Sequence, residues 1–157
     1  MKRIWPAVMV LLLGACGVRP SGPADAGRAP TGVAPGVTLY FVDGHERLRP
    51  QLRRTGRLGT IPEALSLLLF GPGESGLHTE IASSSTMTVV VSTGPALIRL
   101  MVPLTIRDVT PLGIDQIVCT VLGVHVQGGG SRNTKVQVRF TLPTPESDRL
   151  RTCPLIR

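Results

Sequence analysis

After a Gly- and Pro-rich stretch, the chain is dominated by short runs in which apolar and polar residues alternate. The first run, VTLYFV at 37–42, is rich in β-branched and aromatic residues and precedes an Asp-Gly turn signal. The last run, at 135–142, alternates Val136, Val138 and Phe140 with polar side chains. Such alternation is typical of strands with one buried face. We predict strands at 37–42, 47–55, 86–92, 96–102 and 135–142, with a further short strand at 124–126.

Helix signals open two other segments. Thr60 followed by Glu63 forms a capping box, and Gly71-Pro72 ends the apolar run that follows. Thr110-Pro111 combines a cap with a first-turn proline, and apolar residues then recur every three or four positions until Gly123. We predict helices over these two segments, a loop at 73–85, a turn at 127–133 and an irregular tail at 143–157.

The predicted order of elements is β-β-α-β-β-α-(β)-β. Hairpins together with only two helices favour the α+β class, with helices on one side of a sheet. We therefore expect a single α+β domain that contains a mostly antiparallel sheet, with the two helices packed on one face.

The N-terminus, MKRIWPAVMVLLLGAC, has the parts of an export signal. Lys2 and Arg3 precede an apolar run of about ten residues, half of what a membrane-spanning helix needs. The run ends in LGAC, which resembles the lipobox of bacterial lipoproteins. The resemblance implies that Cys16 is diacylated and becomes the new N-terminus after cleavage. The alternative is an ordinary signal peptide with an incidental cysteine.

These signals divide the chain into four parts. Residues 1–15 are the predicted lipoprotein signal peptide, and 16–36 hold the lipidated cysteine and a flexible Gly/Pro/Ala linker. The domain follows at 37–142, and the tail at 143–157. We expect the protein on the extracytoplasmic face of the cell membrane, held there by lipid, because two acyl chains give stable anchoring.

The chain is basic, with 17 Lys and Arg against 10 Asp and Glu, a formal charge of +7. Loss of Lys2 and Arg3 with the signal peptide leaves 15 against 10, or about +5. Five arginines in and beside the second strand would form a basic rim, which is a candidate partner surface: Arg47, Arg49, Arg53, Arg54 and Arg57. Arginine bias from a GC-rich genome explains the charge equally well.

Nucleic acid is not an expected partner, because an exported chain rarely meets it. Base-stacking platforms are also scarce, since the chain has one Tyr, three Phe and one Trp, and that Trp lies in the signal peptide. Anionic lipid head groups and wall polymers are the counter-charges that we expect outside the cell.

Three stretches, in order, resemble the GerMN domain, named from sporulation and germination proteins: VTLYFVDG, PEALSLLLFGP and IDQIVCTVLG. The last carries Gln116 and Thr120 at positions where that family has a glutamine and a threonine. The resemblance covers about residues 37–142, with the loop at 73–85 matched only loosely. It implies an extracytoplasmic role in envelope assembly or signalling. It implies no defined enzymatic activity and supplies no catalytic residues.

Cys119 and Cys153 remain once Cys16 is assigned to lipid. An even pair in an exported domain favours a disulfide. Such a bridge would hold a tail that has few apolar residues of its own. The alternative is a pair of free thiols, with Cys119 simply part of the core.

No set of residues predicts catalysis or a metal site. His45, His78 and His125 are scattered and have no obvious acidic partner by spacing, and Ser83 to Ser85 lack a nucleophile-elbow motif. No Cys or His pair has metal-ligand spacing, so we expect neither metal nor cofactor. Gln116 is either a buried tie between helix and sheet or a ligand contact.

We therefore predict a non-enzymatic binding or scaffold module of the cell envelope. Its partner would be another envelope protein or a wall polymer, contacted through the arginine rim or the loop at 73–85. The alternative is an extracytoplasmic sensor or ligand-binding accessory to a membrane signalling or transport system. A hydrolase is the third hypothesis, and it lacks a nucleophile and base set.

Overall fold

The computed structural model describes residues 35–83 and 88–156. Each of the five main predicted strands and both predicted helices has its counterpart there. The order of elements is β1 (Val37–Val42), β2 (Leu48–Arg53), α2 (Ile61–Leu69), β3 (Val90–Thr93), β4 (Leu97–Met101), η1 (Ile106–Asp108), α3 (Pro111–Gln127), β5 (Lys135–Arg139), η2 (Pro145–Asp148) and β6 (Leu150–Arg151).

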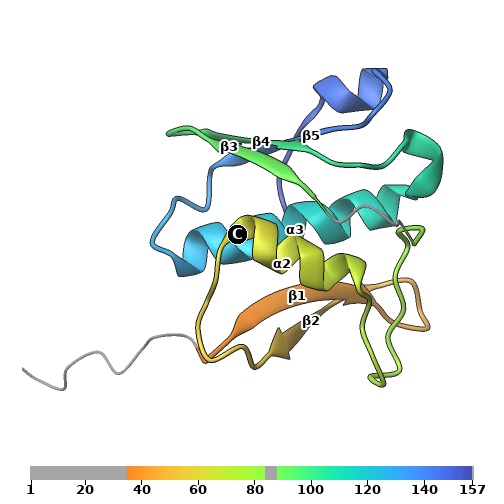
Figure 1. The fold of residues 1–157 in the computed structure, drawn as a ribbon, viewed down its shortest axis with the longest axis vertical. Helices are drawn as coiled ribbons and strands as arrows, with labels where there is room; N and C mark the ends of the chain where they lie inside the picture. The colour runs from red at the N-terminus through yellow and green to blue at the C-terminus, as the bar shows by residue number, and fades with distance from the viewer. Residues whose placement is uncertain (1–34, 84–87, 157) are drawn as a thin grey trace, which may run out of the picture. The chain divides into compact units, whose positions relative to one another are not determined.

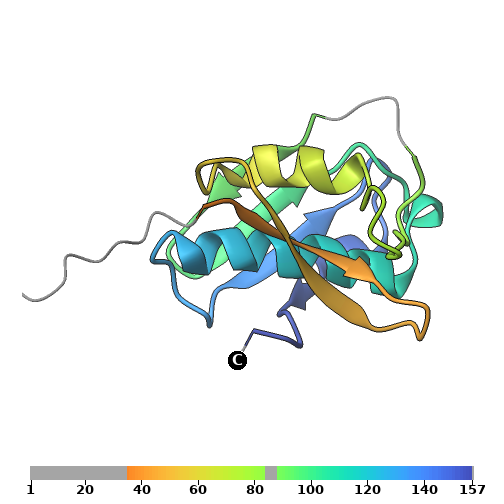
Figure 2. The same cartoon turned by 90° about the horizontal axis from the view of Figure 1, so that it is seen from below.

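The two helices lie between two sheets (Figure 1). Strands β3, β4, β5 and β6 form a four-stranded sheet in that order, and both helices pack on one face of it. Strands β1 and β2 form a separate two-stranded sheet on the other side of the helices. In Figure 2, helices α2 and α3 run side by side behind this two-stranded sheet. The α+β class is confirmed. What the sequence did not predict is the division of the strands into two sheets.

Three of the four strand pairings in the described residues are antiparallel, and β4 with β5 is parallel. The hairpins β1–β2 and β3–β4 need only short turns. The parallel pair needs a long crossover, which η1 and α3 supply. The sheets are therefore mostly antiparallel, as predicted, with α3 as the connection of the one parallel unit.

The core lies where the helices meet the inner faces of both sheets. Leu39 and Phe41 from β1, Leu68 from α2, and Ile98 and Leu100 from β4 are each fully buried. Helix α2 begins at the predicted capping box, in which Thr60 Oγ1 accepts from the N–H of Glu63 and the Glu63 carboxylate accepts from the N–H of Thr60. Its apolar positions then face the core.

Helix α3 corrects one local prediction. It passes through Gly123 and ends at Gln127, so there is no strand at 124–126, and His125 lies on the helix. Gly123 lies against β1: a Cβ there would be 3.4 Å from Tyr40 Cε2. Its small size therefore serves close packing, and the helix ends instead at the cap residue Gly128.

The C-terminal tail is also more ordered than predicted. It contains the short helix η2 and the strand β6, which pairs with β5 through Val136 with Arg151 and Gln137 with Leu150. Cys153 follows β6 and is buried. The segment therefore extends the four-stranded sheet and belongs to the same compact unit as the rest of the domain.

Candidate functional site

The predicted arginine rim divides into paired and unpaired side chains. Arg49 Nε lies 2.7 Å from Asp43 Oδ2. Arg53 Nη2 donates to the carbonyl oxygen of Gly71 at 2.8 Å, and Arg57 Nη2 lies 2.5 Å from Glu63 Oε1. These three arginines tie β2 and its flanking loops to the turn before it, to helix α2 and to the end of that helix. Only Arg47 and Arg54 are exposed with no side-chain partner among the described residues.

Asp43 organises the β1–β2 turn. Its Oδ1 accepts from the backbone N–H groups of His45 and Arg47, at 2.9 and 3.1 Å. The hydrogen bond from Arg49 lowers the pKa of Asp43 to about 2, and the two backbone donors act in the same direction. Asp43 is therefore a carboxylate at neutral pH, and its charge is used within the turn.

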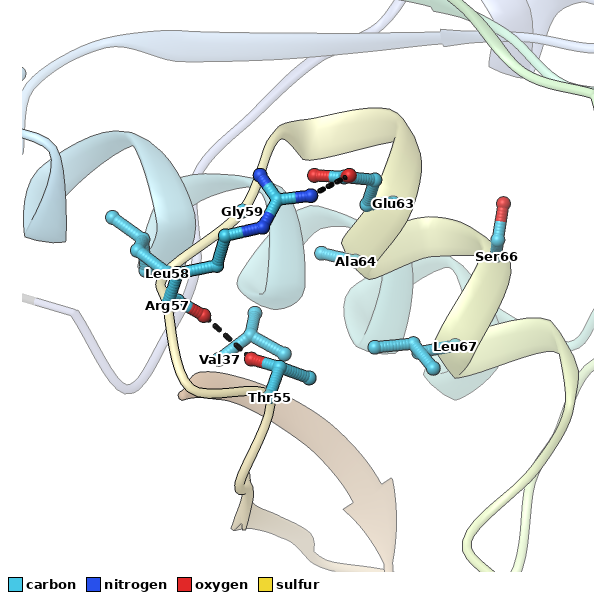
Figure 3. A pocket seen from close by; sticks show the side chains of 9 residues that line it. All are labelled: Val37, Thr55, Arg57, Leu58, Gly59, Glu63, Ala64, Ser66 and Leu67. Carbon is cyan, nitrogen blue, oxygen red and sulfur yellow. Dashed lines mark hydrogen bonds and ion pairs between the residues drawn. The ribbon is translucent and has the colours of Figure 1, made fainter. Parts of the chain in front are cut away.

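A cavity of about 330 Å³ opens between the loop before α2 and the first turns of that helix (Figure 3). The residues that line it are Val37, Thr55, Arg57, Leu58, Gly59, Glu63, Ala64, Ser66 and Leu67. Figure 3 shows Arg57 reaching from the loop to Glu63 on the helix. The volume lies at the lower end of the range for small-molecule sites. We call this cavity, with its mainly apolar lining, the α2 groove.

The carboxylate of Glu63, which lines the α2 groove, is already engaged in contacts within the protein. Its carboxylate accepts from the N–H of Thr60 at 2.6 Å and from the Thr60 hydroxyl at 3.1 Å, and it pairs with Arg57. These contacts, the backbone N–H of Thr60 first, hold the pKa of Glu63 below its usual value. A low pKa and occupied oxygens suit a helix cap. They do not suit a general base, whose pKa should lie near the working pH.

Gln116 and Thr120 join helix α3 to the edge of β1 that is not paired with β2. Both side chains are fully buried. Gln116 Nε2 donates to the carbonyl of Tyr40 at 3.1 Å, and Thr120 Oγ1 accepts from the N–H of Tyr40 at 3.2 Å. Gln116 Oε1 also accepts from the N–H of Glu80 at 2.8 Å. Both ends of the Gln116 amide thus satisfy buried backbone groups, which agrees with the interpretation of Gln116 as a tie between helix and sheet.

The loop predicted at 73–85, of which 84 and 85 lie outside the described residues, is held along its second half. Val42 and His78 exchange backbone hydrogen bonds, and Ile81 forms a bridge with Val109. The N–H of Thr110 donates to the carbonyl of Glu80 beside Gly113, where a Cβ would come within 2.3 Å of that oxygen. Only a glycine permits this approach of loop and helix.

Among the described residues, two of the three histidines have a side-chain contact. His78 Nε2 lies 3.1 Å from Glu80 Oε1, a pair that spacing alone had not suggested, and it arises because both residues lie on one extended segment. His125 Nε2 lies 3.1 Å from Thr134 Oγ1, and His45 is exposed. Within residues 35–83 and 88–156, no group of three or more His, Cys, Asp or Glu side chains is placed to hold a metal ion.

Cys119 and Cys153 have their Sγ atoms 2.01 Å apart, at disulfide distance. Both residues are buried, and the bond joins helix α3 to the segment after β6. This agrees with the bridge predicted from the sequence. Cys16, the predicted lipid attachment site, lies outside the described residues. Among the helices that the structure describes, none is both long and apolar enough to cross a membrane.

Compared with known proteins, the chain matches no family model, no curated protein and no solved structure. The likeness to the GerMN domain therefore rests on the sequence motifs alone.

Proposed function

We propose that this protein is a lipid-anchored, extracytoplasmic binding module of the bacterial cell envelope, without enzymatic activity. The observation that carries the proposal is the buried pair of Cys119 and Cys153 at disulfide distance. Disulfides persist in oxidising compartments outside the cytoplasm. The pair therefore agrees with the export signal and the LGAC motif at the N-terminus, and with the likeness to the GerMN domain.

The ties around β1 and β2 support a binding role. Asp43, Glu63 and Gln116, which would be the natural polar candidates for chemistry, are each engaged in holding backbone or a neighbouring side chain. A domain joined to a lipid anchor through the predicted Gly/Pro/Ala linker suits a module that holds a partner close to the membrane.

Intact-mass analysis of the full chain, produced in a bacterial host and extracted with detergent, tests the anchor. We expect a mature chain that begins at Cys16 and carries a diacylglyceryl group, with its two acyl chains, joined to the Cys16 sulfur by a thioether. A double variant, Cys119→Ala with Cys153→Ala, should carry the same added mass, since it keeps Cys16. A mature chain without acyl mass, or one cleaved at another residue, would contradict the lipoprotein assignment.

A sensor or ligand-binding accessory is the second candidate, and the α2 groove favours it. The groove has the volume and the apolar lining of a small-ligand site. The fluorescent apolar probe anilinonaphthalene sulfonate reports on such a site. Leu67→Trp should fill the groove and abolish the fluorescence gain of the folded protein. Leu69→Trp, on the same helix and outside the lining, should leave it intact. An equal response of the two variants would exclude the groove as the binding site.

A further inference from the structure

The outer face of the four-stranded sheet, which points away from the helices, has an unusual composition. The register places nine side chains on this face: Val90, Ser92, Leu97, Arg99, Met101, Lys135, Gln137, Arg139 and Leu150. Their neighbours along the strands, such as Leu100 and Val138, point inward and are fully buried. We call these nine residues the outer sheet face.

Large apolar side chains on the outer sheet face are exposed to solvent. Val90, Met101 and Leu150 have 58%, 60% and 57% of their surface accessible. Val90 and Met101 are direct cross-strand partners, and Arg139 follows Met101 in the same row. Both helices pack on the other side of the sheet (Figure 1). The short helix η2 is on the outer side and contacts this face, where Gln137 Nε2 donates to the carbonyl of Ser147 at 3.0 Å. More than half of the surface of Val90, Met101 and Leu150 nevertheless stays accessible to water.

The cations on this face have no ion-pair partner among residues 35–83 and 88–156. Arg99, Lys135 and Arg139 are exposed, and the described part of the chain contains no ion pair to any of them. No strand position on the face is acidic. The acidic residues nearest in sequence to β5 and β6, Glu146 and Asp148, belong to η2, and Glu146 already pairs with Arg149 and Arg151.

We propose that the outer sheet face docks on an anionic lipid bilayer. Its three free cations match lipid phosphates, and each Lys or Arg near an anionic membrane adds favourable electrostatic energy. The apolar side chains between them distinguish a bilayer from a hydrophilic wall polymer. Val90, Met101 and Leu150 gain nothing from a polymer, whereas they can enter the boundary between head groups and acyl chains, as interfacial protein segments do.

The length of the linker permits this orientation. Docking depends on the proposed lipid anchor only because the anchor keeps the domain near the bilayer. Strand β1 begins in the layer farthest from the outer sheet face (Figure 1), and packed layers are separated by about 10 Å. The twenty residues from 17 to 36 reach about 65 Å when fully extended. They can therefore connect an anchor in the membrane to β1 with the outer sheet face against the lipid.

Vesicle sedimentation tests the docking without the anchor. The protein is the oxidised mature chain, residues 16–157 with Cys16→Ser, which contains the whole compact unit. We expect it to bind vesicles of equal phosphatidylglycerol and phosphatidylcholine, and to bind phosphatidylcholine alone far more weakly. Replacing Arg99, Lys135 and Arg139 by Gln should lower the partition coefficient roughly fivefold per cation, or about a hundredfold in all. Met101→Gln should lower it further without changing its salt dependence.

A triple variant with the same loss of charge is the matched control. Arg47→Gln, Arg54→Gln and Arg107→Gln remove three exposed cations elsewhere and should reduce binding less than about fivefold. Equal losses in the two triple variants would overturn the proposal, as would equal binding to both vesicle types. Binding to soluble polyphosphate without binding to vesicles would assign the face to a polymer instead. Thermal unfolding confirms that each variant is folded. None of these outcomes depends on whether Cys16 is acylated.

Discussion

The two sheets of this domain use their charges in opposite ways. In the two-stranded sheet and its loops, Arg49, Arg53 and Arg57 each contact an acceptor within the protein. On the outer face of the four-stranded sheet, Arg99, Lys135 and Arg139 contact none among the described residues. The first set holds β2 and the segments around it in place. The second set is left for a partner.

This contrast shows that a cluster of charge in the sequence is not by itself a binding surface. The five arginines of the rim lie close together in the sequence, yet three of them make contacts within the protein. The cations of the outer sheet face lie on β4 and β5, more than thirty residues apart in sequence, and have no ion-pair partner in the part of the chain that the structure describes. Availability of a charge, and the apolar neighbours beside it, are therefore better guides to an interface than local charge density.

Removing the disulfide should give the largest effect on stability. The same change tests whether the outer sheet face depends on its last strand, β6. The bond spans 34 residues and holds β6, which carries Leu150. We expect Cys119→Ala with Cys153→Ala to lower the free energy of unfolding by about 3–4 kcal/mol in urea titrations, because the unfolded chain is no longer constrained. Vesicle binding should persist, since the cations lie on β4 and β5.

Reduction of the unsubstituted protein is the control for this double variant. It removes the same bond without changing a residue, so the two losses should agree. Two alkylatable thiols in the unreduced mature protein, or a loss below about 1 kcal/mol, would contradict the stabilising role of the bond.

Gln116 should give the next largest effect, confined to the two-stranded side of the molecule. Gln116→Leu leaves the carbonyl of Tyr40 and the N–H of Glu80 without their partner. We expect a loss of about 2–3 kcal/mol, because a buried polar group without a hydrogen bond costs about 1–3 kcal/mol. The comparison of the two sheets predicts unchanged vesicle binding for the folded variant.

Gln127→Leu is the matched control for Gln116→Leu. Gln127 lies on the same helix and bonds the side chain of Thr38, but it is exposed. Its replacement should change the free energy of unfolding by no more than about 0.5 kcal/mol. Similar losses for the two glutamines would show that burial of the Gln116 amide is not what matters.

Local signals in the sequence predicted much of the fold. The capping box at Thr60, the Asp-Gly turn after β1 and the alternation in β5 act over a few residues, and each is present. Gly123 failed as a helix stop because packing against Tyr40 outweighs the low helix propensity of one glycine. The parallel pairing of β4 with β5 has no local signal, since it depends on how α3 crosses the sheet.

The site was predicted less well, for a related reason. The sequence indicated that the arginines at 47–57 are numerous and near a strand. It could not indicate that Arg53 reaches the carbonyl of Gly71, eighteen residues away. The alternation in β5 did predict that Lys135 and Arg139 share a polar face. Only the register, which places Met101 beside Arg139 and Val90 beside Met101, shows that cations and apolar side chains share one face of the sheet.

Acid titration should give the smallest effect, and it examines the paired charges of the two-stranded sheet directly. The contacts of Asp43 lower its pKa from 3.8 to about 2. Its contribution to stability is therefore present above about pH 4 and is lost as the pH falls toward 2. The Arg49 side chain is 51% exposed, so salt screens its pair with Asp43 and we expect a small difference. Asp43→Asn should be slightly less stable than the unsubstituted protein at pH 6, and the two should converge near pH 2.

Glu46→Gln, which changes an exposed carboxylate in the same turn, should leave the pH profile unaltered. Parallel profiles for the unsubstituted protein and Asp43→Asn would show that the charge of Asp43 is not used within the turn, and the contrast between the two sheets would then rest on Arg53 and Arg57 alone.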